Sequence, residues 1–430
     1  MNAPAYIDIR PVTRPISAEV VVPGSKSITN RALILAALAE GTSTLENALF
    51  SEDSHWCAEA LRRLGISVEA DPAASRFVVH GQGGHFPATT ADIFVGNSGT
   101  TARFMLAAAA LGRGDYRFDG VPRMRQRPIA PLIAALRPLG AEFTFEGAPE
   151  CFPLVLHASG LRGGQTTLDA TASSQYLTAL LQAAPYASRD VAIQLTGELV
   201  SEPYIDMTLQ LMAQFGLPVD KGNYRNFTIR AGGRYRAQSF TIEPDASNAT
   251  YFFAAAAVTG GRVRVPHLTA DSLQGDAGFV RVLEQMGCTV TRGADFTEVQ
   301  GPRKLNGIDI DLNAMSDTSQ TLAAIAPFAT SPVVIRNIGH NRHKETDRIA
   351  AVATELRKLG AQVDEAPDGL TIYPSVLHGA AIDTYDDHRM AMAFAVTGLV
   401  QPGVRIMNPA CTAKTFPDYF ERFERLYGGS

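Results

Sequence analysis

Two hydrophobic patterns alternate along the chain and divide it into repeats. The first is an apolar run of helical period with charged flanks, which ends in Gly and passes into a β-rich run. Its copies are LRRLGISVE (61–69), LRPLGAEFT (136–144), LMAQFGLPV (211–219), LEQMGCTVT (283–291), LRKLGAQVD (356–364) and a shorter FERLYGG (423–429). Because Gly readily takes the left-handed conformation that ends helices, each copy predicts an amphipathic helix followed by a strand.

The second pattern is a polar cluster that opens an Ala-rich and almost wholly apolar run. Its copies occupy 26–41, 97–112, 173–187, 245–261, 316–330 and 386–399. A helix that is apolar on nearly every side is buried, so these helices should lie inside and the amphipathic ones outside. The patterns alternate at intervals of roughly 70 residues, which predicts six small α/β modules.

The starts of the buried helices are rich in Ser, Thr, Asn and Asp, the residues that cap helix N-termini. A helix N-terminus presents unpaired N–H groups and the positive end of a dipole. Several such ends, if they converge, would attract anions to one cleft. Ordinary capping explains any single copy equally well, but six copies with added Lys, Arg, Gln and His favour an anion site.

Composition narrows the class of protein. The 430 residues favour two or three domains, and 46% hydrophobic with 19% charged residues is typical of a globular chain. The formal net charge of −5 gives no basic field for nucleic acid. Four scattered cysteines form no metal-like pattern, and neither a signal sequence nor a membrane-length apolar run is visible. We therefore expect a cytoplasmic protein without a metal or another cofactor.

Four regions place charged residues beside the predicted helix starts. They are GSKSITNR (24–31), GVPRMRQRPIAPL (120–132), NIGHNRHKETDRIA (337–350), and YDDHRMAMAF (385–394) with CTAKTFPDYF (411–420). The first is not a nucleotide-binding P-loop, because the order Gly24-Ser25-Lys26-Ser27 lacks the spaced upstream Gly. A solvated basic surface or a salt-bridged helix would also explain the second and third regions. No hydrolase elbow, zinc-protease motif or dinucleotide fingerprint is present.

Seven phrases in these regions and between them resemble the EPSP synthases, a family of enolpyruvyl transferases. In order along the chain they are PGSKSITNRALILAALAEG, NSGTTARFM, VPRMRQRPI, SSQYLTALL, KETDR, DDHRMAMAFA and CTAKTFPDYF. They span nearly the whole chain. The resemblance implies an α/β fold of two similar domains, each built from three βαβαββ-type units with buried helices and outer sheets, an inside-out α/β barrel. It also implies a discontinuous first domain of 1–23 plus 243–430, a second domain of 24–242, and an active site in the cleft between them.

The resemblance further implies the chemistry. Such enzymes transfer the enolpyruvyl group of phosphoenolpyruvate to the 5-hydroxyl of shikimate 3-phosphate and release phosphate, through addition, a tetrahedral intermediate and elimination. The two substrates bring about five to six negative charges, because a phosphate monoester carries about −1.5 to −2. A base at the hydroxyl and an acid at the methylene carbon are needed, and we expect Asp317 as base, Glu345 as acid and Lys26 as a charge-stabilising or proton-sharing group.

The motifs transfer the family's binding residues to positions in this chain. For shikimate 3-phosphate they are Lys26, Ser27, Arg31, Ser173, Ser174, Gln175, Ser201, Tyr204, Asp317, Asn341 and Lys344. For phosphoenolpyruvate they are Lys26, Gly99, Arg123, Gln175, Glu345, Arg348, Arg389 and Lys414. Gly99 leaves room beside the phosphoenolpyruvate site, so glyphosate should compete with that substrate. Familiar members carry Asn four residues before the KETDR lysine, whereas this chain has His340 there and Asn341 beside it.

Two alternatives stay open. A transferase acting on UDP-N-acetylglucosamine shares the fold and the donor, but it carries a reactive Cys in the loop that corresponds to 120–128, and this loop has none. A non-enzymatic anion-binding protein would use the same helix starts and basic residues without needing Asp317 and Glu345. The resemblance favours a monomeric enzyme that binds two small molecules and no nucleic acid or membrane.

Overall fold

The computed structural model describes residues 4–220 and 223–427. The chain forms two compact units. Unit 1 comprises residues 1–23 and 243–430, and unit 2 comprises residues 24–242. The chain thus leaves unit 1 after Pro23, forms the whole of unit 2, and returns at Glu243.

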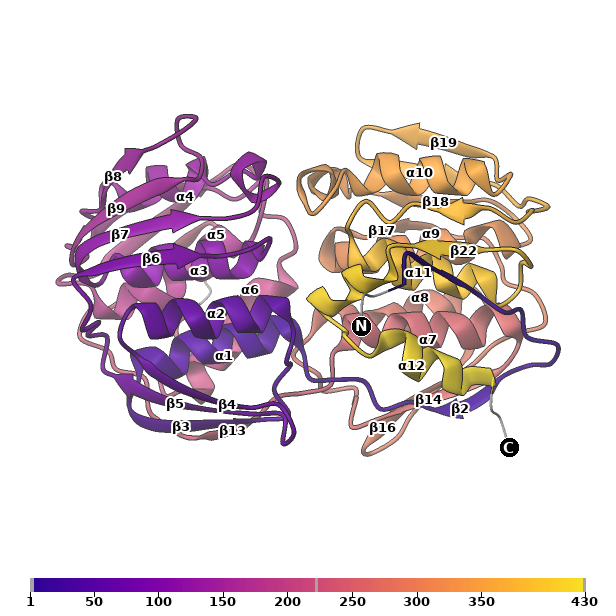
Figure 1. Cartoon of the computed structure of the whole chain (residues 1–430), viewed down its shortest axis with the longest axis horizontal. Coiled ribbons are helices and arrows are strands. Elements are labelled where there is room, and N and C mark those ends of the chain that lie inside the picture. Colours follow the sequence, from indigo (N-terminus) through magenta and orange to yellow (C-terminus); the bar gives the residue numbers. More distant parts are fainter. Residues whose placement is uncertain (1–3, 221–222, 428–430) are drawn as a thin grey trace. The chain divides into compact units, whose positions relative to one another are not determined.

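Unit 2 contains six α-helices and three outer sheets within its described residues (Figure 1). The helices are α1 (Lys26–Leu38), α2 (Glu52–Arg63), α3 (Gly99–Ala109), α4 (Ala130–Leu136), α5 (Gln175–Ala183) and α6 (Pro203–Gln214), with 3-10 turns η1 (Met124–Gln126) and η2 (Ala184–Tyr186). The strands are β3 (Glu40–Glu46), β4 (Ser67–Asp71), β5 (Arg76–Gln82), β6 (Thr90–Phe94), β7 (Arg113–Asp119), β8 (Glu142–Phe145), β9 (Leu154–Ser159), β10 (Gly164–Asp169), β11 (Val191–Thr196), β12 (Asn226–Ile229) and β13 (Ser239–Thr241).

Unit 1 repeats this plan in its described part. Its helices are α7 (Ala246–Thr259), α8 (Phe279–Gln285), α9 (Ser319–Ile325), α10 (Arg348–Lys358), α11 (His388–Gly398) and α12 (Tyr419–Glu424). Its 3-10 turns are η3 (Gly275–Gly278), η4 (Asn313–Thr318), η5 (Ala326–Phe328), η6 (Gly339–His343), η7 (Pro409–Lys414) and η8 (Arg425–Tyr427). Its strands are β1 (Tyr6–Asp8), β2 (Ser17–Glu19), β14 (Arg262–Pro266), β15 (Thr289–Arg292), β16 (Phe296–Gln300), β17 (Asp309–Asp311), β18 (Val333–Arg336), β19 (Val363–Ala366), β20 (Gly369–Ile372), β21 (Ala381–Ile382) and β22 (Arg405–Met407).

The Ala-rich helices form the centre of each unit. Every residue of α3 and of α11 is buried. In unit 2, α3 packs against both α1 and α5, and in unit 1, α7, α9 and α11 pack against one another. The sheets lie outside these helices in each unit (Figure 1). The expected fold class, with buried helices and outer sheets, is therefore confirmed.

Four of the sheets in the described chain share one strand order. Each begins with a parallel pair and continues with two antiparallel neighbours, in the orders β13-β3-β5-β4, β6-β7-β9-β8, β2-β14-β16-β15 and β17-β18-β20-β19. The other two sheets, β10-β11-β12 and β21-β22-β1, have three strands. Strands distant in sequence complete the sheets: β13 pairs with β3, and β1 pairs with β22.

The glycines of the first pattern end their helices as predicted. Gly65, Gly140, Gly216, Gly287 and Gly360 all have φ between 90° and 108°. This left-handed geometry turns the chain out of the helix towards the following strand. The helix end is confirmed for these five copies, and the expected strand follows four of them, whereas residues 217–220 after Gly216 form no strand. Gly428 of the sixth copy lies outside the described residues.

The predicted caps are confirmed at four of the buried helices. Ser25, Ser98, Asp245 and Asp387 each accept a hydrogen bond from a backbone N–H in the first turn of α1, α3, α7 and α11. The expectation was wrong at α9, which begins at Ser319 after the 3-10 turn η4 and not near 316. Asp317 cannot serve there as a cap, because its carboxylate binds basic side chains instead. Helix α5 also begins without a side-chain cap.

No helix in the described part of the chain combines the length and the apolar character that a membrane crossing requires.

Candidate functional site

Seven charged residues of unit 1 form one connected group, which we call the charge cluster. Its members are Asp317, Lys344, Glu345, Arg348, Asp387, Arg389 and Lys414. They come from η4, the segment before α10, the first turns of α10 and α11, and the end of η7. Four cations meet three carboxylates, so the cluster carries a formal excess of one positive charge.

Arg348 lies at the centre of the charge cluster. Its side chain is 2% exposed and donates from Nε to Asp387 at 2.7 Å, from Nη2 to Glu345 at 2.8 Å and from Nη1 to Asp317 at 3.1 Å. Burial alone would lower the pKa of Arg348, but these three carboxylates outweigh it and raise that pKa above its ordinary value. Arg348 is therefore a permanent buried cation that orients all three acids of the cluster.

Asp317 is the acid with the most cationic contacts in the cluster. Lys344 Nζ lies 2.5 Å from Oδ1, and Arg389 Nη2 lies 2.7 Å from Oδ2. Burial is the largest cause that lowers the pKa of Lys344; Asp317 opposes this shift, whereas Arg348 adds to it. Lys344 therefore gives up a proton more easily than an exposed lysine, next to a carboxylate that could receive one.

Glu345 lies between two cations on the other side of Arg348. Its Oε2 accepts from Arg348, and its Oε1 accepts from Lys414 Nζ at 2.8 Å. Both side chains of the Glu345–Lys414 pair are less than a tenth exposed. The pair can exchange a proton without help from bulk water, which suits acid–base work.

His340 and Asn341 lie behind the charge cluster and support it. His340 Nε2 lies 2.8 Å from Ser316 Oγ, which also accepts from Lys344 Nζ at 3.2 Å. Burial, with Lys344 as the next cause, lowers the pKa of His340 to about 3, so its imidazole is neutral near pH 7. Asn341 is fully buried and donates to Ser316 O and Ser319 Oγ. These contacts give Asn341 a supporting role, and its contact with the substrate stays a prediction.

In unit 2, the first predicted residues gather around the start of α1. Lys26 Nζ lies 3.8 Å from Asp53 Oδ2, and Lys26 keeps partial exposure while Asp53 is buried. Arg31, one turn further, is buried and donates to Thr208 Oγ1, Thr178 Oγ1 and two backbone carbonyls. Burial lowers the pKa of Arg31 to about 10, which leaves it charged at neutral pH.

Two arginines converge on Gly99 at the start of α3. A Cβ atom on Gly99 would lie 2.4 Å from Arg103 Nη1 and 2.4 Å from Arg127 Nη2. Arg103 donates to Gln175 Oε1 at 2.8 Å, and Arg127 donates to Asn97 O at 2.9 Å. Both side chains are buried, so Gly99, Gln175 and two guanidinium groups form a compact, strongly basic site.

Arg123, which the sequence assigns to phosphoenolpyruvate, lies four residues before Arg127, and its assignment stays a prediction. It occupies the cap position of η1 and is half-buried, whereas Arg127 faces Gly99 and Arg125 binds Asp119 through two hydrogen bonds. The sequence analysis missed Arg103 and Arg127 as candidates. Their signals were present: Arg103 follows Gly99 by one helical turn, and Arg127 lies in the Pro-bounded loop shortly before the next helix.

The remaining predicted residues of unit 2 lie at the starts of α5 and α6. Ser173 Oγ accepts from Gln175 N–H, and Ser174 is buried. Ser201 has a left-handed backbone, with φ 55°, and its carbonyl accepts from Tyr204 N–H. Arg31 donates hydrogen bonds to the carbonyls of Tyr204 and Ser27. Its guanidinium group also lies over the Tyr204 ring. The predicted residues of unit 2 therefore surround Arg31 and Gly99.

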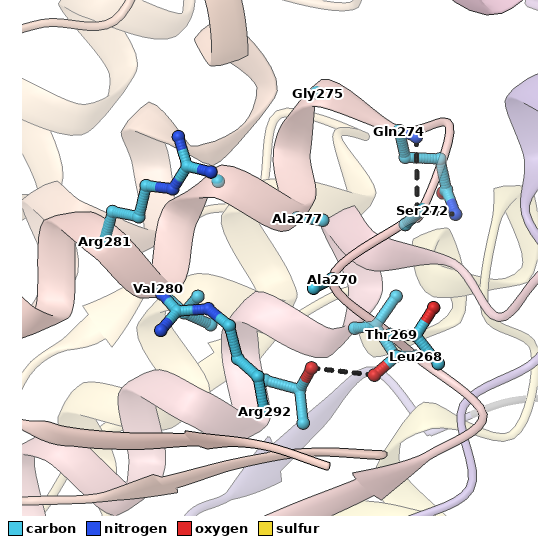
Figure 2. Close-up of a pocket in the computed structure, with 12 residues that line it drawn as sticks. Leu268, Thr269, Ala270, Ser272, Gln274, Gly275, Ala277, Val280, Arg281 and Arg292 are labelled. Carbon is cyan, nitrogen blue, oxygen red and sulfur yellow. Dashed lines mark hydrogen bonds between the residues drawn. The ribbon is translucent and has the colours of Figure 1, made fainter. Parts of the chain in front are cut away.

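A separate pocket of about 280 Å³ lies in unit 1 beside η3 and α8 (Figure 2). Arg281 and Arg292 line it, together with Gln274, whose N–H donates to Ser272 Oγ. Arg292 is bound to Glu284 by two hydrogen bonds. None of the residues that the sequence analysis predicts lines this pocket, so it is distinct from the charge cluster. Across the described residues, no group of His, Cys, Asp and Glu is arranged to hold a metal ion.

Comparison with known proteins gives one answer. A protein-family model described as EPSP synthase (3-phosphoshikimate 1-carboxyvinyltransferase) matches residues 11–423. The chain is 57% identical over 422 residues to the 3-phosphoshikimate 1-carboxyvinyltransferase of Trichormus variabilis, with 98% of this chain and 99% of that protein covered. It is 58% identical over 420 residues to the protein of the same name from Nostoc punctiforme, with the same coverage.

Solved structures agree with the sequence comparison. The EPSP synthase of Acinetobacter baumannii superposes with a TM-score of 0.81 at 26% identity, over 97% of each chain. The enolpyruvyl transferase NikO of Streptomyces tendae superposes with a TM-score of 0.76 at 18% identity, over 98% of this chain and 97% of that one, which shows the shared fold alone. The chain belongs to the EPSP synthase family, the 3-phosphoshikimate 1-carboxyvinyltransferases.

Proposed function

We propose that this chain transfers the carboxyvinyl group of phosphoenolpyruvate to the 5-hydroxyl of shikimate 3-phosphate and releases inorganic phosphate. The observation that carries the activity is the family match across residues 11–423. The geometry supports it, because both units concentrate buried cations where the sequence predicts the two anionic substrates. The reaction supplies the shikimate pathway of aromatic amino-acid biosynthesis.

Each substrate binds its own group of cationic side chains. Phosphoenolpyruvate binds Arg348, Arg389 and Lys414 in unit 1, together with the basic site at Gly99. Arg123 stays in this proposed set, and Arg127 and Arg103 join it because both guanidinium groups reach the start of α3. Arginine presents two parallel N–H donors, which suits phosphate and carboxylate groups. Shikimate 3-phosphate binds the residues around Arg31, with Lys26 between the two ligands.

Asp317 and Glu345 carry the proton transfers. In the addition step, Asp317 takes the proton of the 5-hydroxyl, and the freed oxygen attacks C2 of phosphoenolpyruvate. Glu345 delivers a proton to C3, which becomes a methyl group, and Lys414 can resupply Glu345 across their 2.8 Å contact. In the elimination step, C3 returns a proton to the Glu345–Lys414 pair, the C–O bond to phosphate breaks with its electron pair leaving on the phosphate, and the carboxyvinyl ether remains.

We propose that both units contribute residues to substrate binding and that binding changes the conformation of the chain. The exclusion of water that follows would protect the tetrahedral intermediate. We further propose that the enzyme acts as a monomer in the cytoplasm, where its four free cysteines stay reduced. A fall in the radius of gyration when both substrates are added, measured by solution X-ray scattering, would support closure. An unchanged radius with bound substrates would exclude it.

Phosphate release tests the activity and the acid–base assignment together. The purified chain should release phosphate with both substrates and with neither alone, whereas a protein that merely binds anions would release none. Asp317→Asn and Glu345→Gln keep the shape of each side chain and remove its charge, so each should lower kcat by about 100-fold or more. Near-normal turnover in both variants would show that other groups move the protons. Failure of UDP-N-acetylglucosamine to replace shikimate 3-phosphate excludes the related transferase activity.

A further inference from the structure

The turn 383–387, between β21 and α11, has a strained backbone. Tyr385 has φ 53° and Asp386 has φ 56°. They are the only two neighbouring non-glycine residues with positive φ in the described chain. Side chains disfavour this left-handed conformation, so it persists only where surrounding contacts enforce it.

A buried glutamate beneath the turn supplies the contacts. Glu355 projects from α10, and its side chain has no exposed surface. Its Oε1 accepts from the Tyr385 hydroxyl at 2.6 Å, and its Oε2 accepts from the backbone N–H of Asp383 at 3.1 Å. Lys358 Nζ bridges Glu355 and Asp383, at 2.9 Å and 2.5 Å. The carboxylate of Glu355 thus ties the turn to α10 at two points.

Two residues of the same turn, Asp386 and Asp387, contact segments that carry members of the charge cluster. Asp387 caps α11 and accepts from Arg348 Nε at 2.7 Å. Asp386 Oδ1 accepts from Asn408 Nδ2 at 3.2 Å. Asn408 is the residue that precedes η7, whose last residue is Lys414. Arg348 and Lys414 meet at Glu345, so the turn sets the relative position of the two cations that bind this acid.

We propose that the Glu355–Tyr385 hydrogen bond is a positioning device for the phosphoenolpyruvate site. Glu355 and Tyr385 act through Asp386 and Asp387, and neither needs to touch the substrate. Tyr385 is 41% exposed as a residue, so packing alone does not fix the turn and the hydroxyl contact matters. The inference rests on the proposed function, because it assigns the cluster to phosphoenolpyruvate.

Tyr385→Phe removes the hydroxyl and keeps the ring. Tyr373→Phe is the matched control, because Tyr373 also donates to a carboxylate, Asp364 at 2.8 Å, on the outer sheet of the same unit. We expect Tyr385→Phe to raise the KM for phosphoenolpyruvate at least about fivefold, while the KM for shikimate 3-phosphate stays within about twofold of wild type. The control should leave both constants unchanged. The melting temperatures of the two variants should agree within about 2 °C.

A pair of variants at Asp386 tests the second half of the path. Asparagine tolerates the left-handed backbone and keeps an oxygen that can accept the hydrogen bond from Asn408. Alanine disfavours the left-handed backbone and has no side-chain acceptor. Asp386→Asn should therefore retain the wild-type KM for phosphoenolpyruvate, and Asp386→Ala should raise it as Tyr385→Phe does.

Two outcomes would overturn the inference. One is identical kinetics in Tyr385→Phe and Tyr373→Phe. The other is a Tyr385→Phe variant in which kcat and the melting temperature fall while the KM values for the two substrates change by the same factor. That result would show a general structural role. If the wild-type chain itself releases no phosphate from the two substrates, the proposed function fails instead, and the kinetic comparison does not arise.

Discussion

Arg348 shows how a buried cation is maintained in unit 1. Three carboxylates from three segments surround one guanidinium group, and each takes a different nitrogen or pair of nitrogens. Removing one partner of a buried ion pair costs about 3–5 kcal/mol, because the other charge is left uncompensated. A substitution of Arg348 would therefore mix lost binding with lost folding, and residues at the edge of the cluster give cleaner tests.

Gly99→Ala is a test at the basic site of unit 2. The new Cβ would meet the guanidinium groups of Arg103 and Arg127 at 2.4 Å, and both must move because carbon and nitrogen cannot approach so closely. We expect the inhibition constant for glyphosate to rise at least about tenfold, with a smaller rise in the KM for phosphoenolpyruvate. Gly147→Ala is the control, because its Cβ would meet only Pro153 Cδ, at 3.5 Å. Unchanged glyphosate inhibition in Gly99→Ala would place the inhibitor elsewhere.

His340 makes the stability of the chain depend on pH. Its pKa is about 3 in the folded protein against 6.5 ordinarily, because burial and Lys344 oppose the imidazolium. Between these values the unfolded chain binds a proton that the folded chain does not, so the free energy of unfolding falls as the pH drops from 6.5 towards 3. His340→Asn removes this group and should shrink the loss of melting temperature between about pH 7 and about pH 5. The exposed His85→Asn should leave that loss unchanged, and an equal loss in His340→Asn would show that other groups cause it.

Residue types predicted the chemistry of the site better than its geometry. The KETDR and DDHR phrases located Glu345, Arg348 and Arg389, whose contacts the structure then supplies. Which arginine of 123–127 faces Gly99 depends on how η1 turns, and sequence alone does not determine that rotation. The burial of Asn341 depends likewise on the kinked turn η4, through Ser316.

At the scale of elements, the short turn η1 sends neighbouring arginines to different places. Arg125 binds Asp119 on β7, whereas Arg127 returns to Asn97 at the start of α3. Arg127 is buried and Arg125 is exposed, although only one residue separates them. The turn η1 thus places two arginines of equal charge in different environments, and they can therefore have different tasks.

The pair Arg127→Ala and Arg125→Ala separates these tasks. A hydrogen bond to a charged group contributes about 1.5–3 kcal/mol, so Arg127→Ala should raise the KM for phosphoenolpyruvate at least about tenfold. Arg125→Ala removes the same charge from an exposed position and should change that KM by less than about twofold. Equal effects would indicate that both arginines act only through the general field of the protein.

Element boundaries followed the sequence where local geometry decides them. The five glycine helix ends and the four side-chain caps need only the residue itself. The late start of α9 could not be foreseen, because Asp317 binds Lys344 and Arg389, which lie 27 and 72 residues further along the chain. The missing fourth strand beside β12 is likewise not visible in the repeat pattern, since the phrase at 211–219 looks like the others.

At the scale of the whole molecule, unit 2 is an unbroken segment that contains all of its own strands. The last strand, β13, pairs in parallel with β3 and completes the sheet of the first repeat. Phe240 of β13 packs against Phe215, with the ring centroids 5.6 Å apart. A segment that has its own core and takes every described strand of its sheets from within itself should fold alone.

The fragment 24–242 should therefore unfold in one cooperative thermal transition, followed by circular dichroism. The fragment 24–237 lacks β13 and should lose at least about 2 kcal/mol of unfolding free energy, since it gives up strand pairing and a partly buried Phe. An unfolded 24–242 fragment would mean that unit 2 depends on unit 1.

The repeat period indicated six modules, and the resemblance supplied their grouping into two units. The grouping could not come from periodicity alone, because six equal modules can be divided in several ways. The pairings of β13 with β3 and of β2 with β14 decide it, and both are parallel contacts between segments far apart in sequence.

The pairing of β1 with β22 has a consequence for how the chain is made. Tyr6–Asp8 lies against Arg405–Met407, so one of the first strands to leave the ribosome needs a partner that leaves almost last. At about 5–20 residues per second, the interval is on the order of 20–80 seconds. Unit 2 can finish folding within that interval, while the N-terminal strand of unit 1 waits unpaired. During synthesis, the sheet that contains β1 and β22 is therefore completed only after nearly the whole chain has been made.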